Sequence, residues 1–246
     1  MTSTGVLRFA RYAYPPNQLG YCGPDDNRAL LEYVAAGTAD GGLLDLARRF
    51  EGAYPYLCLI AHANGIADAF DERVVEAYWL GNSLLSGVTG PTFMASLTER
   101  FGPRLGAQEL RWLEPKVATG ARPHHNFHVF DMYSRLGLMR DERATRALEV
   151  MDRCRISWAT VVKVETERLL VNRPPLLYLD GRLTLGPATP LWVTWTTGGL
   201  GLISEVKPAD RVAVHWDWAC ERLDERGLRS LAAATRRCLN LANQTI

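Results

Sequence analysis

The stretch Cys154-Arg-Ile-Ser-Trp-Ala-Thr-Val-Val-Lys-Val164 marks the point at which the chain changes from helix-forming to strand-forming sequence. Before it, apolar residues recur every three to four positions, which is the spacing of a buried helix face. After it, short runs rich in valine, leucine and tryptophan alternate with turn-forming residues, a pattern typical of strands. We therefore expect an α+β protein with an irregular, all-helical domain over residues 1–153 and a β-rich domain with a C-terminal helix over residues 154–246.

The β-rich part predicts five or six short strands before about residue 219, with apolar runs at 161–164, 176–179, 191–195 and 212–214. Asp180-Gly181 predicts a hairpin turn, because glycine accepts a positive φ without strain, and residues 207–210 predict a second turn. Short strands divided by tight turns favour a small, strongly bent β-barrel. A final helix should begin near Asp224, which can cap it, and present an apolar face through Leu239.

The part before the barrel predicts helices from residue 26 onward. Residues 12–26 combine prolines, glycines and aromatic residues in a way that predicts a loop. Two helical segments follow, one around Leu30 and one around Leu44, divided by glycines. Further helices are expected at about residues 55–64, 71–85, 90–101, 106–116, 126–137 and 141–153.

Composition restricts the classes of function. The 246 residues hold 28 Lys plus Arg and 27 Asp plus Glu, so no charge excess indicates a nucleic-acid partner. The N-terminus lacks a signal-peptide pattern, and no continuous apolar stretch reaches the roughly 18 to 20 residues that span a membrane. No Cys-x-x-Cys pair occurs, so a disulfide framework is not expected. We expect a cytoplasmic protein with reduced thiols and no membrane partner.

Two segments at the ends of the β-rich part carry a resemblance to a known family. The first is the Cys154 stretch quoted above, and the second is Val206-Lys-Pro-Ala-Asp-Arg-Val-Ala-Val-His-Trp-Asp-Trp-Ala219. Together they resemble the HypC/HupF family of hydrogenase-maturation chaperones, whose members open with a cysteine and close with a "V-K-x-G-D-x-V-x-V-H" segment before a C-terminal helix. The resemblance covers roughly the last 90 residues. In this sequence Trp158-Ala159 replaces the family's Pro-Gly, and Ala209 replaces a glycine.

The resemblance implies a fold, a function and a site. The fold is a small HypC-like (OB-like) β-barrel. The function is to carry an iron moiety, with cyanide and carbonyl ligands, and to deliver it to a client such as a hydrogenase large subunit or another maturation factor. The family's ligands map to Cys154 and His215. A thiolate and a neutral imidazole suit ferrous iron, although a buried cysteine and a hydrogen-bonded histidine also fit a purely structural role.

Two other clusters could add metal ligands from the helical part. Pro123-His124-His125-Asn126-Phe127-His128 places three imidazoles within five residues, and spacings of one and four occur in metal sites. Asp131 could be a further metal ligand, or it could accept a hydrogen bond from one of the histidine ligands. Cys22 precedes a tight turn and two carboxylates that can cap the next helix, a position that favours a reactive thiolate as well as a buried structural cysteine.

Three hypotheses follow for the function. The first is an accessory protein, or chaperone, for metalloenzyme maturation. The second is a metal-dependent or acid-base enzyme built from a repurposed HypC-like barrel and a helical domain. The third is a scaffold that binds a partner through its aromatic surface. No phosphate-binding loop, nucleophile elbow or dinucleotide fingerprint occurs in the sequence, which disfavours the commonest cofactor enzymes.

Overall fold

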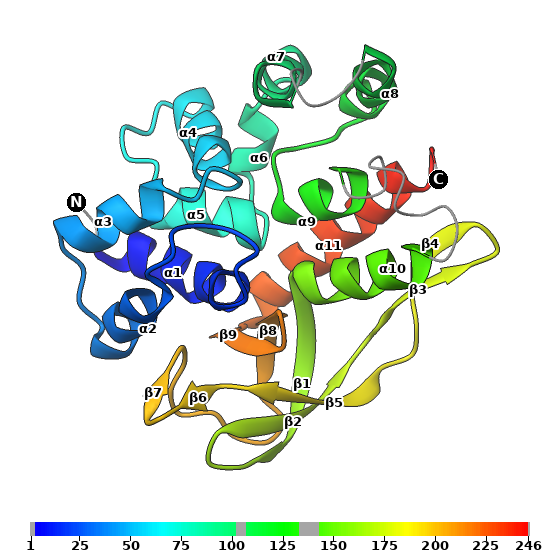
Figure 1. Cartoon of the computed structure of the whole chain (residues 1–246). Helices are drawn as coiled ribbons and strands as arrows, with labels where there is room; N and C mark the ends of the chain where they lie inside the picture. The colour runs from blue at the N-terminus through cyan, green and yellow to red at the C-terminus, as the bar shows by residue number, and fades with distance from the viewer. Residues whose placement is uncertain (1–2, 102–106, 133–142, 246) are drawn as a thin grey trace.

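A computed structural model describes residues 3–101, 107–132 and 143–245 of the chain. It is a mixed α and β structure in which helices come first, strands follow, and one long helix ends the chain (Figure 1). Before the sheet lie α1 (Ser3–Gln18), α2 (Asn27–Ala36), α3 (Gly41–Arg48), α4 (Tyr54–Ala63), α5 (Glu72–Trp79), α6 (Leu84–Gly87), α7 (Gly90–Phe101), α8 (Ala107–Ala118), α9 (His125–Phe127), the π-helical turn η1 (His128–Met132) and α10 (Arg143–Cys154).

The first helix corrects the prediction of a loop over residues 12–26. Helix α1 continues to Gln18 through Pro15 and Pro16, although a proline inside a helix costs about 3 kcal/mol. Burial explains the difference, because α1 is enclosed by other elements and its Phe9 and Tyr12 are fully buried. Tyr12 stacks on Trp79 of α5, with ring centroids 5.2 Å apart. Only residues 19–26 form the loop that leads into α2.

Two other helix predictions need a smaller correction. The predicted helix over 71–85 ends at Trp79, and the chain turns there through Gly81, whose φ is +88°. The predicted helix over 126–137 begins as a single turn, α9, and continues as η1 to Met132. Residues 133–137 of that prediction lie outside the described residues, as do residues 141–142 of the next.

The sheet contains β1 (Ser157–Val164), β2 (Arg168–Arg173), β5 (Thr189–Thr194), β8 (Arg211–His215) and β9 (Trp218–Arg222). These strands join in the closed order β1-β2-β5-β9-β8. All pairs are antiparallel except β5 with β9, which meet through the single residue pair Thr194 and Trp218. The apolar runs predicted at 161–164, 191–195 and 212–214 lie in β1, β5 and β8 of this sheet, but the described residues form nine strands in all rather than five or six. Closure through one residue pair also makes the sheet less regular than a clean barrel.

Two hairpins extend from the sheet, and both predicted turns are confirmed. Strands β3 (Leu176–Leu179) and β4 (Arg182–Leu185) pair around Asp180 and Gly181, which have φ values of +48° and +76°. Strands β6 (Thr196–Thr197) and β7 (Leu200–Gly201) form the second hairpin. The turn before β8 is closed by a hydrogen bond from Lys207 N to Asp210 Oδ2 of 3.0 Å.

One hydrophobic core spans the boundary that the sequence predicted between residues 153 and 154. It includes Phe9 of α1 and Trp79 of α5 together with Ala213 of β8 and Trp218 of β9. The final helix α11 (Glu225–Ala242), capped by Asp224 as predicted, adds Leu231 and contacts α9, β1 and β4 (Figure 1). A separate, smaller apolar cluster fills the sheet itself, with Val161, Leu169, Val171, Val193, Val212 and Val214 among its members.

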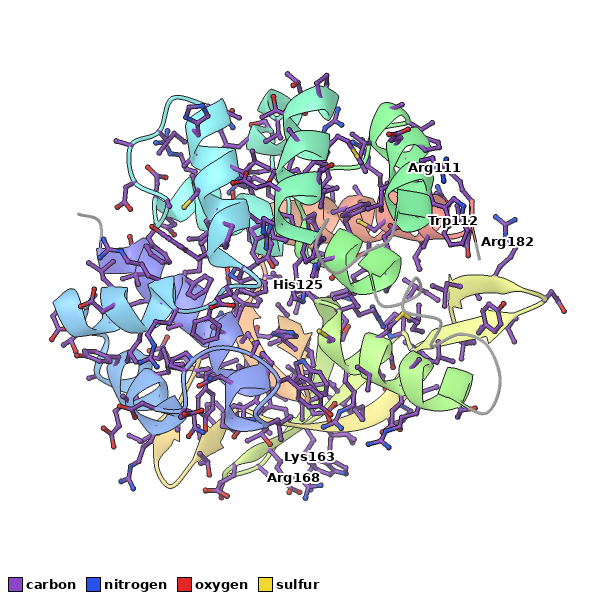
Figure 2. The ribbon with its side chains drawn as sticks, turned by 45° about the horizontal axis from the view of Figure 1, so that its top comes forward. Arg111, Trp112, His125, Lys163, Arg168 and Arg182 are labelled. Atoms are coloured by element: carbon purple, nitrogen blue, oxygen red, sulfur yellow. The ribbon has the colours of Figure 1, made fainter. Side chains whose placement is uncertain are left out.

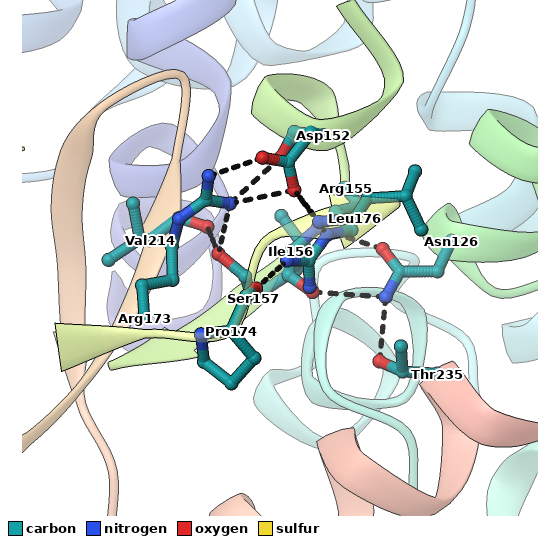
Figure 3. Close-up of polar contacts among 10 residues, drawn as sticks. All are labelled: Asn126, Asp152, Arg155, Ile156, Ser157, Arg173, Pro174, Leu176, Val214 and Thr235. Atoms are coloured by element: carbon teal, nitrogen blue, oxygen red, sulfur yellow. Dashed lines mark hydrogen bonds and ion pairs between the residues drawn. The ribbon is translucent and has the colours of Figure 1, made fainter. Parts of the chain in front are cut away.

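The junction between α10 and β1 is fixed by buried and partly buried polar contacts (Figure 3). The Asp152 carboxylate accepts from Arg173 Nη2 at 2.5 Å, from Arg155 Nε at 2.9 Å and from the backbone N of Leu176 at 2.9 Å. The Asn126 side chain accepts from Ile156 N at 2.8 Å and donates to Ile156 O at 3.0 Å. These contacts fix the chain before Cys154, at Asp152, and after it, at Ile156.

Replacing Asn126 with alanine should lower the free energy of unfolding by about 3 kcal/mol, because the buried N–H and C=O of Ile156 would lose their partner. Asn243 is a matched control, since its side chain makes the same pair of bonds to the backbone of Leu183, at 2.8 and 2.9 Å, from a half-buried position. Water can replace that pair, so Asn243→Ala should cost only about 1 kcal/mol. Urea unfolding measures both variants, and equal losses would contradict the role given to Asn126.

Candidate metal centre

Three side chains that can bind a metal converge where the helices meet the sheet. They are His125 of α9, Cys154 at the end of α10 and His215 at the end of β8, and one ligand atom from each lies within 4.8 Å of the other two. All three residues are buried. The sequence proposed Cys154 and His215 as the leading pair and His125 only as an addition, and the structure brings all three together. Figure 2 labels His125, which lies in the middle of the molecule.

His125 is oriented by hydrogen bonds to both ring nitrogens. Its Nδ1 lies 3.2 Å from the hydroxyl of Tyr78, and its Nε2 lies 2.9 Å from the carbonyl oxygen of Cys154 and 3.9 Å from the sulfur. Because the Cys154 carbonyl can only accept, this contact places the proton on Nε2, and Nδ1 accepts from the Tyr78 hydroxyl. Binding a metal at Nε2 would require the proton to be on Nδ1 instead, from which the ring would donate to Tyr78. Burial lowers the pKa of His125 to about 4, so the ring is neutral at pH 7.

His215 is held in a single tautomer. Its Nδ1 lies 2.8 Å from the carbonyl oxygen of Tyr12, and because a carbonyl only accepts, the proton must be on Nδ1. The other nitrogen, Nε2, therefore carries a lone pair, yet it is buried and has no hydrogen-bond partner among the described residues. Desolvation, followed by the proximity of His125, holds the pKa of His215 well below its usual range. An unpartnered, neutral imidazole nitrogen beside a cysteine fits a metal ligand.

Cys154 supplies the sulfur of the group. Desolvation raises the pKa of its thiol to about 12, so the sulfur is protonated at pH 7. A metal ion reverses this preference, because a coordinating thiol loses its proton. The buried thiol is consequently inert as a nucleophile and competent as a ligand.

A strained turn positions His215. The next two residues, Trp216 and Asp217, have φ values of +47° and +60°, as in a two-residue type I′ hairpin turn. A positive φ is unusual for a bulky residue such as tryptophan. Arg153 stabilises the turn, since its Nε lies 2.8 Å from Asp217 Oδ2 and its carbonyl accepts from Trp216 N at 2.7 Å. Backbone strain held in this way is common at functional sites.

The three donors border a pocket with about 80 Å³ of space, enough for an ion and a small ligand. Its walls are mainly apolar and include Tyr78, Trp79 and Trp216. A much larger groove, of about 850 Å³, runs between α2 and the β6–β7 hairpin, but none of the three donors lines it. We place the site in the smaller pocket because the metal-binding atoms are there.

The remaining predicted ligands lie at different distances from this centre. Cys22 is exposed and also lines the pocket, but its sulfur is not in the group of three donors. His128 also lines it, but its Nδ1 faces the hydroxyl of Tyr56 at 3.4 Å. The His124 ring caps α9 by accepting from Asn126 N at 3.0 Å, and its outer edge lies against Gly81 rather than in the pocket. Asp131, expected to assist a ligand, forms a buried ion pair with Lys116 instead.

Two residues that orient the ligands were not found from the sequence. Tyr78 contacts His125 from α5, and the Tyr12 carbonyl contacts His215 from α1. A tyrosine on an apolar helix face gives no sign of such a role, and a backbone carbonyl gives none at all. Because the sequence predicts a loop over residues 12–26, it also gives no position for the Tyr12 carbonyl.

Comparisons with known proteins place the chain in a family without assigning it an activity. The family described as "Family of unknown function (DUF6390)" matches residues 1–246. No curated protein matches the chain, and no solved structure does. Among the described residues, no helix is both long enough and apolar enough to cross a membrane.

The low pKa of His215 predicts a loss of stability in acid. The unfolded chain takes up a proton at this residue below about pH 6.5 while the folded chain does not, so stability falls as the pH falls. The difference in unfolding free energy between wild type and His215→Phe should shrink by about 2 kcal/mol from pH 7 to pH 5. Urea unfolding with a chelator present at both pH values measures it. A difference that stays constant would show that His215 is protonated equally in both states.

Proposed function

The chain belongs to the DUF6390 family, and we propose that it is a metal-binding accessory protein that holds one transition-metal ion through His125, Cys154 and His215. The observation that carries the proposal is the meeting of one thiol and two neutral imidazoles within 4.8 Å. The unpartnered Nε2 of His215 supports it, because a buried nitrogen without a hydrogen bond is costly unless it has another partner.

The donor set favours particular metals. One thiolate and two imidazoles suit ferrous iron, zinc, cobalt or copper, whereas magnesium and calcium prefer oxygen donors. The charges of these ligands also favour a transition-metal ion. A single thiolate would neutralise part of a divalent charge in an apolar pocket, and the neutral histidines need no deprotonation to bind.

With three protein donors, the fourth position of a four-coordinate ion would be open toward the pocket. Such a position can hold a small external ligand, and it also allows the ion to leave by exchange with donors of another protein. Within the resemblance to the HypC/HupF family, we propose that the ion is iron with cyanide and carbonyl ligands. The client would be a hydrogenase large subunit or another maturation factor. In this proposal Cys154 and His215 are the ligands of a HypC-like barrel, and His125 is added by the helical part.

A second candidate is a metal-dependent enzyme, because three protein ligands with an open fourth position are also the arrangement of catalytic zinc sites. In that case the metal would polarise a small substrate or activate water in the pocket. The two candidates share the same three ligands and differ in the metal and its external ligands.

Metal analysis of protein purified without oxygen tests the proposal. Wild type should bind one iron per chain after incubation with ferrous iron, and Cys154→Ser should weaken binding by more than about 100-fold. Cys58→Ser is a control, since Cys58 is on α4 and does not line the pocket. Unchanged iron binding by Cys154→Ser would reject the site. Infrared bands in the cyanide and carbonyl region would favour the carrier, whereas zinc retained by the purified protein would favour the enzyme.

The hydroxyl of Tyr78 should contribute to affinity through His125, because it accepts the Nδ1 proton that metal binding at Nε2 requires. Tyr78→Phe should weaken metal binding by about 10-fold. Tyr56→Phe is the matched control, since Tyr56 stacks on Tyr78 but its hydroxyl faces His128, which is outside the group of three. Titration with a metal indicator compares the two variants, and equal effects would contradict the role of Tyr78.

A further inference from the structure

The loop between α1 and α2 carries a fourth thiol to the mouth of the pocket. Cys22 lines the pocket together with His125, Cys154 and His215. Unlike those three residues it is exposed, and its sulfur lies outside the group of atoms that are within 4.8 Å of one another. Although the residue is exposed, desolvation raises the pKa of its thiol to about 12, so the sulfur borders the pocket without belonging to the group of three donors.

The position of Cys22 is specified by contacts on both sides. The side-chain amide of Asn17 donates to the carbonyl oxygens of Cys22 at 2.7 Å and of Pro24 at 2.6 Å. Gly23, with a φ of +85°, lies against the ring of Phe50, where a Cβ would be only 2.4 Å from a ring carbon. Only glycine fits this conformation and this spacing. The loop is thus held over the pocket rather than projecting at random.

Tyr21, the residue before Cys22, connects this loop to the β8–β9 turn, which directly follows the proposed ligand His215. The ring of Tyr21 stacks on that of Trp216, with centroids 4.2 Å apart and planes 23° apart. Trp216 directly follows His215. Tyr21 remains 53% exposed, so the stack forms part of the mouth of the pocket and faces solvent on its outer side. Opening the stack would uncover the site.

We infer that Cys22 is a fourth, exchangeable thiolate ligand, an inference that rests on the proposed metal site. A second, independent observation supports a ligand here, because Nε2 of His215 is unpartnered among the described residues in a side chain that lines the pocket and is only 1% exposed. With Cys22 added, the ion would have two thiolates and two imidazoles, a set that suits tetrahedral coordination. The thiol releases its proton to solvent as the metal–sulfur bond forms and recovers it when the bond breaks, so no electrons are exchanged.

The location of Cys22 determines which ligand leaves first. His125, Cys154 and His215 are buried, whereas Cys22 is exposed and can therefore be reached first by an incoming donor. A soft donor from a client, such as a cysteine thiolate, can therefore replace Cys22 before the other three release the ion. The loop would close the site during storage and open it for transfer.

Cobalt(II) provides the test, because the intensity of its sulfur-to-metal charge-transfer band increases with the number of thiolate ligands. Full-length wild type, Cys22→Ser, Cys154→Ser and Cys58→Ser are titrated with cobalt without oxygen. Wild type and Cys58→Ser should show equal bands, and Cys22→Ser should bind cobalt with about half the band intensity and a faster loss of the ion to a chelator. Cys22 is exposed, so serine there should leave the fold intact, which circular dichroism verifies.

The outcomes separate this inference from the metal site itself. If Cys22→Ser gives the wild-type band and the wild-type rate of loss, Cys22 is not a ligand, while the three-donor site stands. If wild type binds no cobalt, or if Cys154→Ser keeps the full band, the proposed site is wrong and the inference fails with it.

Discussion

The hydrogen bond between His215 Nδ1 and the carbonyl oxygen of Tyr12, 2.8 Å long, is the contact on which the site depends. It joins the first helix to the sheet, and it fixes the proton on Nδ1 so that Nε2 faces the pocket as a lone-pair donor. A backbone carbonyl in a buried helix is a rigid acceptor, because its position is set by the helix. The site therefore depends on the continuation of α1 through Pro15 and Pro16, because a helix that ended at Tyr14 would not fix the position of the Tyr12 carbonyl.

Charged contacts strengthen the same interface between helices and sheet. Glu221 of β9 accepts from Arg8 at 2.6 and 2.9 Å and from the hydroxyl of Tyr12 at 2.9 Å. Beside this interface, Glu76 of α5 accepts from Arg226 of α11 at 2.6 Å and so joins two helices. Such partly buried pairs contribute modestly to stability but specify how the elements meet. The three proposed ligands come from elements on both sides of this interface, so the site exists only when the whole chain is folded.

The sequence predicted the features that depend on local chemistry. The strands around Val161, Val193 and Val212, the Asp180-Gly181 turn and the Asp224 cap are specified by residues within a few positions of one another. Helix α1 was missed because its two prolines oppose a helix locally, and only burial against α5 and other elements reverses that preference.

The sequence predicted less of the proposed metal site than of the fold. The proximity of Cys154 and His215, which are 61 positions apart, followed from a family resemblance and not from spacing. His125 joins them because α9 packs beside the α10–β1 junction, a long-range contact that no local pattern encodes. For the same reason His124 and His128, which seemed equivalent to it in sequence, face Gly81 and Tyr56.

The central claim is that one ion binds where two imidazoles and a thiolate converge, and anomalous diffraction from crystals of the metal-loaded protein tests it most directly. We expect a single strong anomalous peak within bonding distance of Nε2 of His125, Sγ of Cys154 and Nε2 of His215. A peak bonded to other residues, or fully loaded crystals with no peak between these three atoms, would contradict the account.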